Sequence, residues 1–220
     1  VLGGRLQVGA DQASGQIGHV LVDPRGPWCG CGRRGCLDAV VRPLPVTFYR
    51  VDASTPLKAP DERFAFFTTT FLPSFVDGIK TGILLVVPSF FDFNRIRQHF
   101  VDENESFACM RDDSKPNEVI TARAKFLREQ VDWLLLSERF HFYHRNKISG
   151  IKHVVFYALP TAPHYAAEIV NMIKAAVTDA TVHFIFNRME VAQLRAIVGD
   201  EKAAFLLQTE QAKHTFIGGQ

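Results

Sequence analysis

Short apolar runs alternate with amphipathic segments along most of the chain, and this alternation predicts its fold. An uninterrupted apolar run of about five residues is typical of a strand buried on both faces of a parallel sheet. We expect such strands at 46–51, 83–88, 106–110, 131–137, 154–158 and 182–187. Apolar residues at helical spacing predict helices at 61–78, 91–101, 117–130, 163–177 and 190–198. Strands and helices in this alternation form a three-layer α/β domain with right-handed crossovers around a parallel sheet.

Prolines mark the beginning of this α/β domain. Four of them lie close together between 43 and 60. Proline at this density breaks helices and is typical of a junction. We therefore place a domain boundary near Pro43, with residues 43–220 in the α/β domain and residues 1–42 in a separate N-terminal segment.

Composition and charge limit the partners of the domain. The chain has 220 residues, 47% of them hydrophobic, and a formal net charge of only +2. A core of useful size can form, and we expect the phenylalanines at 64–75 and 90–93 to belong to it. A charge this small does not attract polyanions in general, so a nucleic-acid contact needs a local cluster of cations. The longest apolar runs are too short to cross a bilayer, and the first residues lack the apolar core of a signal peptide, so we expect no membrane contact and no secretion.

The N-terminal segment contains a cluster of metal-binding side chains. Three of the four cysteines lie close together, separated by glycines that let the backbone fold tightly around an ion, and a histidine precedes them. One imidazole and three thiolates complete the tetrahedral set of a structural zinc site. We expect a zinc-stapled segment in which Zn²⁺ is bound by His19, Cys29, Cys31 and Cys36. The alternative is a surface histidine with three free thiols.

The same cluster carries a family resemblance. Gly18-His19 and Cys29-x-Cys31-Gly32-x-x-Gly35-Cys36-Leu37-Asp38 resemble the ROK family of bacterial repressors and sugar kinases, over about residues 1–41. The resemblance implies that the histidine and the three cysteines hold a structural zinc ion. It does not extend to sugar binding, because Gln16 replaces the acidic sugar ligand of the family. The phosphate-binding D-x-G-x-T segment and the catalytic aspartate of the kinases are also missing from these residues.

A basic, aromatic segment follows the strand at 131–137 and is the main candidate for a binding site. Residues that follow a parallel strand lie at the sheet edge where ligands of open α/β sheets bind. Cations can pair with phosphates, and aromatic rings can stack on unpaired bases; no acidic residue accompanies the cations between 139 and 153. We predict an RNA contact through Arg139, Phe140, His141, Tyr143, Arg145, Lys147 and Lys152. The alternative, which the sequence supports equally, is that the aromatic residues pack under the sheet edge and the cations form a solvated loop.

Four motifs in the α/β domain carry a second resemblance. They are VPSFFDFNRIR at 87–97, SERFHFYHR at 137–145, GIKHVVFY-x-LP at 150–160 and R-x-IVG-x-E-x-AA at 195–204. These motifs resemble the digestive-organ-expansion-factor family, nucleolar proteins of the small-subunit processome that are related to DEAD-box helicases. The resemblance covers about 45–220 and implies a RecA-like domain, equivalent to the C-terminal half of a helicase. It also implies a nucleolar location, pre-rRNA or small nucleolar RNA and processome proteins as partners, and a contact with a missing N-terminal helicase-like lobe.

The groups with which a helicase hydrolyses ATP are replaced in this sequence. After the strand at 131–137 a DEAD-box protein needs a Thr-Asp segment leading to Arg-Gly-x-Asp, but this chain has SERFH at 137–141. The arginine-rich run that stabilises charge on the γ-phosphate is replaced by YAAEIVNMI at 165–173. The residues GIKTG at 78–82 have the wrong order for a phosphate-binding loop. We therefore expect no ATP binding and no catalysis.

These observations leave three interpretations. The first is a non-catalytic RecA-like module of a nucleolar ribosome-biogenesis factor, which acts in small-subunit pre-rRNA processing by binding RNA, processome proteins or both. The second is one half of an ATP-dependent RNA helicase that becomes active with a partner lobe. The third is a zinc-containing, sugar-responsive regulator or sugar-kinase fragment of the ROK type, defined by the first 41 residues. We favour the first because its resemblance covers most of the chain.

Overall fold

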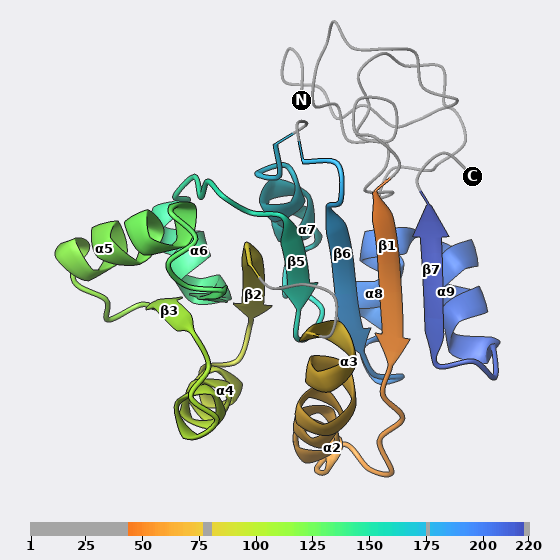
Figure 1. Ribbon diagram of the computed structural model, residues 1–220. Coiled ribbons are helices and arrows are strands. Elements are labelled where there is room, and N and C mark those ends of the chain that lie inside the picture. Colours follow the sequence, from red (N-terminus) through yellow and green to blue (C-terminus); the bar gives the residue numbers. More distant parts are fainter. Residues whose placement is uncertain (1–43, 77–80, 175–176, 218–220) are drawn as a thin grey trace, which may run out of the picture.

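A seven-stranded sheet forms the centre of the protein in the computed structural model, which describes residues 44–76, 81–174 and 177–217. The strands lie in the order β3, β4, β2, β5, β6, β1, β7 (Figure 1). Their bounds are Pro45–Arg50 (β1), Ile83–Val87 (β2), Phe107–Met110 (β3), Trp133–Ser137 (β4), His153–Phe156 (β5), Thr181–Phe186 (β6) and Lys213–Ile217 (β7). The first six strands run parallel, and β7 pairs antiparallel with β1. All six expected strands are therefore confirmed.

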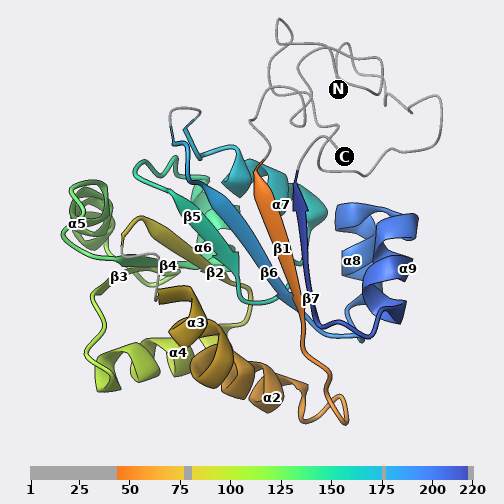
Figure 2. The same ribbon diagram turned by 45° about the vertical axis from the view of Figure 1, so that its right-hand side comes forward.

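Helices cover both faces of the sheet and complete the three layers (Figure 2). One face carries Ala59–Phe66 (α2), the π-helical stretch Phe67–Phe71 (η2), Leu72–Val76 (α3) and Phe90–Asp102 (α4). The other face carries Pro116–Leu127 (α5), Glu138–His144 (α6), Pro163–Val170 (α7), Val191–Val198 (α8) and Asp200–Gln208 (α9).

Alternate side chains of each strand enter two separate cores. In β2, Leu84 and Val86 pack toward α5–α9, whereas Ile83 and Leu85 pack among the phenylalanines of the α2–α4 side. All four side chains are buried. Burial on both faces explains why the parallel strands are continuous apolar runs in the sequence.

β7 corrects the expectation of a wholly parallel sheet. It pairs with β1 from Pro45 opposite Ile217 to Tyr49 opposite Lys213. An antiparallel strand can join an edge after a simple turn, without the long crossover that a parallel strand needs. Its sequence, KHTFI, is short and partly polar, as edge strands commonly are. The sheet is therefore mixed, although parallel pairing dominates.

Two further predictions concern the N-terminal segment and the membrane. The predicted zinc ligands His19, Cys29, Cys31 and Cys36 lie outside the described residues, so the zinc site and the boundary near Pro43 stay predictions. Within the described ranges, no helix has the length and apolar character that crossing a membrane requires.

Candidate nucleic-acid interface

The basic, aromatic segment after β4 begins as the helix α6, not as a loop. Ser137 caps the helix: its Oγ accepts a hydrogen bond from the backbone N of Phe140 at 3.3 Å and donates one to Oδ1 of Asp112 at 2.8 Å. A serine oxygen at this position satisfies an amide that the first helical turn leaves without a partner. The helix ends before Arg145, which has a left-handed φ of 45°. The helical conformation separates the segment into an inner and an outer face.

The inner face of α6 consists of Phe140 and His141, which are each 2% exposed. Phe140 belongs to the core on this side of the sheet, and Nε2 of His141 lies 2.9 Å from Oε2 of Glu168 on α7. Neither ring can stack on a base while the helix is packed. The structure therefore corrects the predicted set of RNA-contacting residues, because Phe140 and His141 are core residues.

The outer face presents an aromatic pair beside two arginines. The rings of Phe142 and Tyr143 meet edge to face with centroids 4.9 Å apart, and the two residues are 51% and 62% exposed. The guanidinium carbon of Arg139 lies 5.8 Å from the ring centre of Tyr143, and that of Arg145 lies 5.5 Å from the ring centre of Tyr165. Exposed rings next to guanidinium groups are the chemistry that binds unpaired bases and phosphates. Phe142, which the predicted set left out, therefore joins the candidate interface.

Both arginines of the outer face have acidic partners from other segments. Nε of Arg139 lies 3.3 Å from Oδ2 of Asp112, after β3, and Arg145 pairs with Oε1 of Glu168. The sequence suggested unpaired cations because it has no acid nearby; the fold corrects this by bringing distant carboxylates to α6. Exposed ion pairs of this kind contribute only about 0.2–1 kcal/mol. A phosphate can therefore compete with either carboxylate.

The two lysines of the predicted set lie at different places. Lys147 is exposed in the turn after α6, two residues beyond Arg145. Lys152 precedes β5 and therefore lies at the amino ends of the strands, whereas α6 begins at their carboxyl ends. Nζ of Lys152 lies 2.9 Å from Oε1 of Glu129 and donates to Oγ1 of Thr81 at 3.2 Å. The hydrogen bond from Lys152 lowers the pKa of the Glu129 carboxyl. The structure therefore keeps Lys147 next to α6 and sets Lys152 apart.

Glu138 closes the sheet edge at the start of α6. It is buried, and its carboxylate accepts hydrogen bonds from the backbone N of Thr161 at 3.1 Å and from the hydroxyl of the same residue. Thr161 follows β5, so these bonds connect the loops that leave two strands. Burial raises the pKa of Glu138, and the hydrogen bonds from Thr161 act in the opposite direction. This carboxylate holds the edge together and is shielded from an external ligand.

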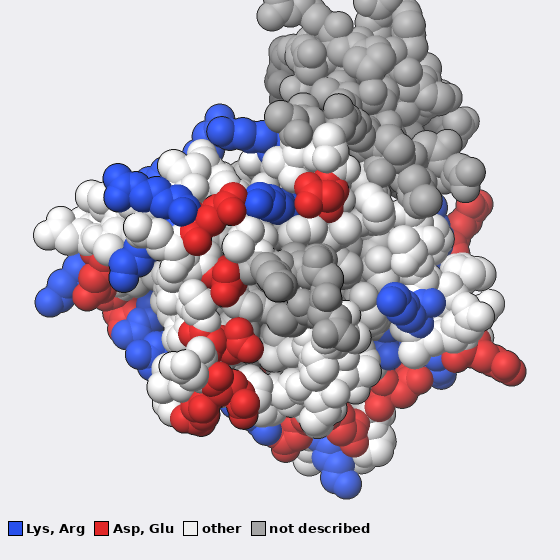
Figure 3. Space-filling model, viewed as in Figure 1, with Lys and Arg blue, Asp and Glu red and all other residues white. Residues whose placement is uncertain are grey.

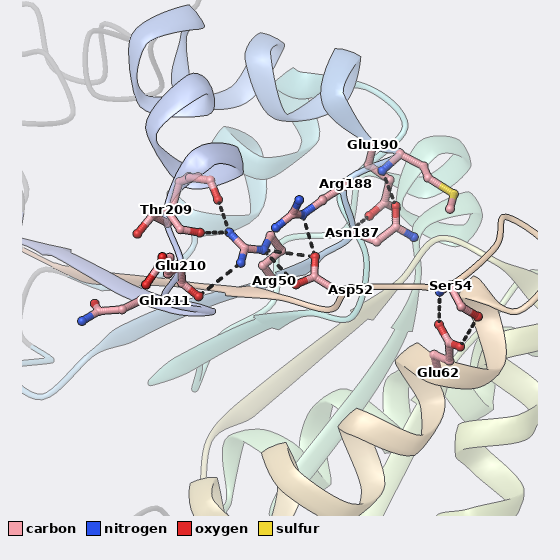
Figure 4. Close-up of polar contacts among 12 residues, drawn as sticks. Arg50, Asp52, Ser54, Glu62, Asn187, Arg188, Glu190, Thr209, Glu210 and Gln211 are labelled. Atoms are coloured by element: carbon pink, nitrogen blue, oxygen red, sulfur yellow. Dashed lines mark hydrogen bonds and ion pairs between the residues drawn. The ribbon is translucent and has the colours of Figure 1, made fainter.

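Two buried arginines, Arg50 at the end of β1 and Arg63 on α2, also hold the fold together. Arg50 is buried; its Nη1 donates to the carbonyl oxygen of Thr209 at 2.6 Å, and its Nε lies 3.2 Å from Oδ1 of Asp52 (Figure 4). Nη2 of Arg63 on α2 lies 2.6 Å from Oε2 of Glu190, which precedes α8. Each guanidinium group connects two segments of the chain, and neither faces outward along the edge.

Phe90 and Phe91 form a second exposed aromatic pair, at the start of α4. They are 64% and 83% exposed, which corrects their expected place in the core, whereas Phe93 is 2% exposed. Ser89 caps α4 by accepting a hydrogen bond from the backbone N of Asp92 at 3.3 Å. This cap fixes the start of the helix, and counting from it places the core positions at 93, 96 and 100. The capping serine is the sequence signal that could have predicted the exposure.

The fold places the chain in a known class. It is similar to the Escherichia coli DEAD-box protein SrmB, in a structure with the regulator of ribonuclease activity A, with a TM-score of 0.53 at 11% identity over 71% of this chain and 84% of that chain. It is also similar to the RNA helicase Prp28 from Chaetomium thermophilum, with a TM-score of 0.53 at 9% identity over 78% of this chain and 38% of that chain. At these identities the likeness shows the fold alone. The class is a mixed, mainly parallel α/β sheet whose fold resembles the RecA-like domains of helicases.

The family follows from the sequence comparisons. Residues 36–216 match the family described as Utp25, C-terminal domain, and the chain belongs to that family. It is 38% identical over 192 residues to the U3 small nucleolar RNA-associated protein 25 homolog of Xenopus tropicalis, and 37% identical over 192 residues to that of Homo sapiens. It is 31% identical over 186 residues to Protein NUCLEOLAR FACTOR 1 of Arabidopsis thaliana. Each comparison covers 84% of this chain and 25% of the relative, so the chain spans about a quarter of these relatives' length.

The names of these relatives agree with the expected nucleolar, ribosome-biogenesis family. The ROK family also matches, over residues 1–42. That match covers less than a fifth of the chain, lies outside the described residues, and overlaps the Utp25 match at 36–42. It does not show membership of the ROK family.

Proposed function

We propose that this chain is a non-catalytic RecA-like module of a nucleolar ribosome-biogenesis factor, and that it acts in small-subunit pre-rRNA processing by binding RNA. The observation that carries the proposal is the outer face of α6, where the exposed pair Phe142 and Tyr143 lies beside Arg139, with Arg145 at the end of the same helix. Ring faces stack on bases and guanidinium groups pair with phosphates. Relatives named for association with the U3 small nucleolar RNA suggest the ligand, a pre-rRNA or a small nucleolar RNA.

The four motifs that resemble the digestive-organ-expansion-factor family, at 87–97, 137–145, 150–160 and 195–204, all lie within the Utp25 match. We therefore take the two names to describe one family. The other proteins of the small-subunit processome are further candidate partners.

Two features support the absence of catalysis. Glu138 is buried and bonded to Thr161, so the loops after β4 and β5 are fastened to each other at the edge where a helicase couples nucleotide to RNA. On α7, where a helicase carries arginines, this chain has Glu168, which pairs with Arg145. A carboxylate there opposes the negative charge that develops on a transferred phosphoryl group.

The edge that holds the carboxyl ends of the parallel strands supports a contact with an N-terminal helicase-like lobe. The rings of Phe90 and Phe91 meet with centroids 5.9 Å apart after β2. Two further exposed apolar side chains, Leu57 after β1 and Met189 after β6, lie in loops at the same edge. The contiguous pair Phe90 and Phe91 offers an apolar contact that another lobe can cover. We assign this edge to the lobe that the family resemblance implies, and α6 to RNA.

Photo-crosslinking of the full chain to an RNA that contains 4-thiouridine, with the adducts mapped by mass spectrometry, tests the RNA contact. We expect adducts on Phe142 and Tyr143 and their loss in the Tyr143→Ala variant. Phe205→Ala is the matched control because Phe205 is 50% exposed on α9. Adducts that survive Tyr143→Ala, or that concentrate on α9, would overturn the proposal.

A further inference from the structure

Positive charge is concentrated in one part of the chain, beyond the residues predicted to contact RNA. Residues 115–153 contain eight Lys and Arg but only four Asp and Glu, a net charge of +4 in a chain whose total is +2. The remainder is therefore net negative. Within the region, none of the cations Arg123, Lys125, Arg128 and Lys147 forms an ion pair with a described residue. These four residues are called the α5 strip below.

The α5 strip is a fixed surface because the turn after α6 is packed against α5. Nη2 of Arg123 donates to the carbonyl oxygen of Lys147 at 2.6 Å. Gly150 has a φ of +94°, and a Cβ at this position would lie 3.2 Å from Cα of Leu127. The side chains of Ile148 and Ile151, both in this turn, are buried in the core. The strip is therefore held in place before any ligand binds, which lowers the entropy cost of binding.

The helix α5 directs its cations outward. Val119, Ala122 and Phe126 are buried, which leaves Lys125 and Arg128, three residues apart, together on the exposed side. Figure 3 shows Lys and Arg side chains near the turn that links α6 to β5, with acidic side chains between them, and a larger group of acidic side chains over α4. The α5 strip therefore continues the basic surface of α6 on the same face of the sheet.

We propose that the α5 strip extends the RNA surface of α6, so that one single strand of RNA is bound by both. In this arrangement unpaired bases stack on Phe142 and Tyr143, and the phosphates that follow pass over Lys147 to Lys125 and Arg128. The inference rests on the proposed RNA binding by α6. A single strand is the ligand class because exposed ring faces can stack only on bases that are free of a partner strand. Contacts to phosphate alone make the α5 part independent of sequence.

The salt dependence of RNA binding distinguishes the two parts of the surface. We would titrate the full chain with a fluorescent single-stranded oligouridine at several KCl concentrations. Each phosphate contact contributes about 0.7 to the slope of log K against log salt for a single strand. Lys125→Gln with Arg128→Gln should lower the slope by about 1.4 and weaken binding roughly 10- to 30-fold at 0.1 M KCl.

Tyr143→Ala should weaken binding with little change in slope. Lys58→Gln with Lys202→Gln removes the same charge from exposed sites just before α2 and on α9, and should change neither quantity.

The outcomes test separately the extension onto α5, the α6 interface and the class of RNA. If the α5 double variant behaves like the Lys58 and Lys202 control while Tyr143→Ala loses affinity, the extension onto α5 is wrong and the α6 interface stands. If no variant differs from the parent chain, or if the parent chain does not bind RNA, both are wrong. If a duplex competes as well as the single strand and Tyr143→Ala has no effect, the ligand class is wrong.

Discussion

Thr181 connects two buried histidines beneath α3. Nδ1 of His153 and Nε2 of His183 each lie 2.8 Å from Oγ1 of Thr181, and the ring of Phe75 meets that of His183 with centroids 4.8 Å apart. Burial lowers the pKa of both histidines, that of His183 to about 3. Both rings are therefore neutral parts of the core.

The contribution of these two histidines to the free energy of unfolding should decrease as pH falls from about 6.5 toward 3. In this window the unfolded chain binds protons on His153 and His183, whereas the folded chain does not, so protonation favours unfolding. Urea unfolding followed from pH 7 to pH 4 measures the slope. His183→Gln should reduce it, and His144→Gln, which changes an exposed histidine, should leave it unchanged. Equal slopes in all three chains would contradict the assignment.

Phe91 and Phe93 should respond differently to the same substitution. Phe91→Ser should change the free energy of unfolding by less than about 0.5 kcal/mol, because the ring is 83% exposed. Phe93→Ser should cost about 3–5 kcal/mol, because the ring is 2% exposed and its loss leaves a cavity. Chemical denaturation of both variants checks this. Similar losses would mean that Phe91 is not a surface residue and does not form part of the proposed lobe contact.

At the scale of elements, the hydrophobic pattern predicted the strands that are buried in the core. It missed elements that depend on a few single contacts. The six parallel strands were predicted because burial on both faces leaves an apolar run in the sequence. α6 was missed because its seven residues depend on the Ser137 cap and on packing against α7. β7 was missed because one face of a short edge strand can carry polar residues.

Arg50, at the end of β1, binds the end of α9 and the residues that lead from it into β7. Replacing it with Met should cost about 1–3 kcal/mol, because the carbonyl oxygen of Thr209 loses its donor, and should speed hydrogen exchange in β7 more than in β2. Arg188→Met is the control: Arg188 pairs with the same Asp52 but is largely exposed. Equal exchange of β7 in the two variants would show that Arg50 does not hold the strand.

At the scale of the whole molecule, the candidate interface was predicted only in part. The sequence identified the segment, and the structure keeps Arg139, Tyr143, Arg145 and Lys147 on its surface. The acidic partners of the cations could not be predicted, because Asp112, Glu129 and Glu168 lie in other segments and meet the cations only through the fold. The inner and outer faces of α6 could not be predicted either, because the sequence analysis did not predict a helix there.

The predicted zinc ligands allow a test of how the chain is divided. If His19, Cys29, Cys31 and Cys36 bind zinc as a separate segment, the purified chain should contain about one zinc ion per molecule. Chelation should release this ion and leave the melting temperature of the α/β domain unchanged, because metal binding contributes folding energy only to the segment it holds. Metal analysis and calorimetry before and after chelation measure both quantities. Loss of the whole α/β fold on chelation would contradict the division.

The most direct test is to measure RNA affinity with and without Mg·ATP, together with phosphate release. It shows whether the domain binds RNA without binding or hydrolysing ATP. The account predicts one dissociation constant within about twofold in both conditions, because no nucleotide is expected to distinguish two states of the chain. It also predicts no RNA-stimulated phosphate release. Hydrolysis that RNA stimulates and that Arg139→Ala abolishes would contradict it.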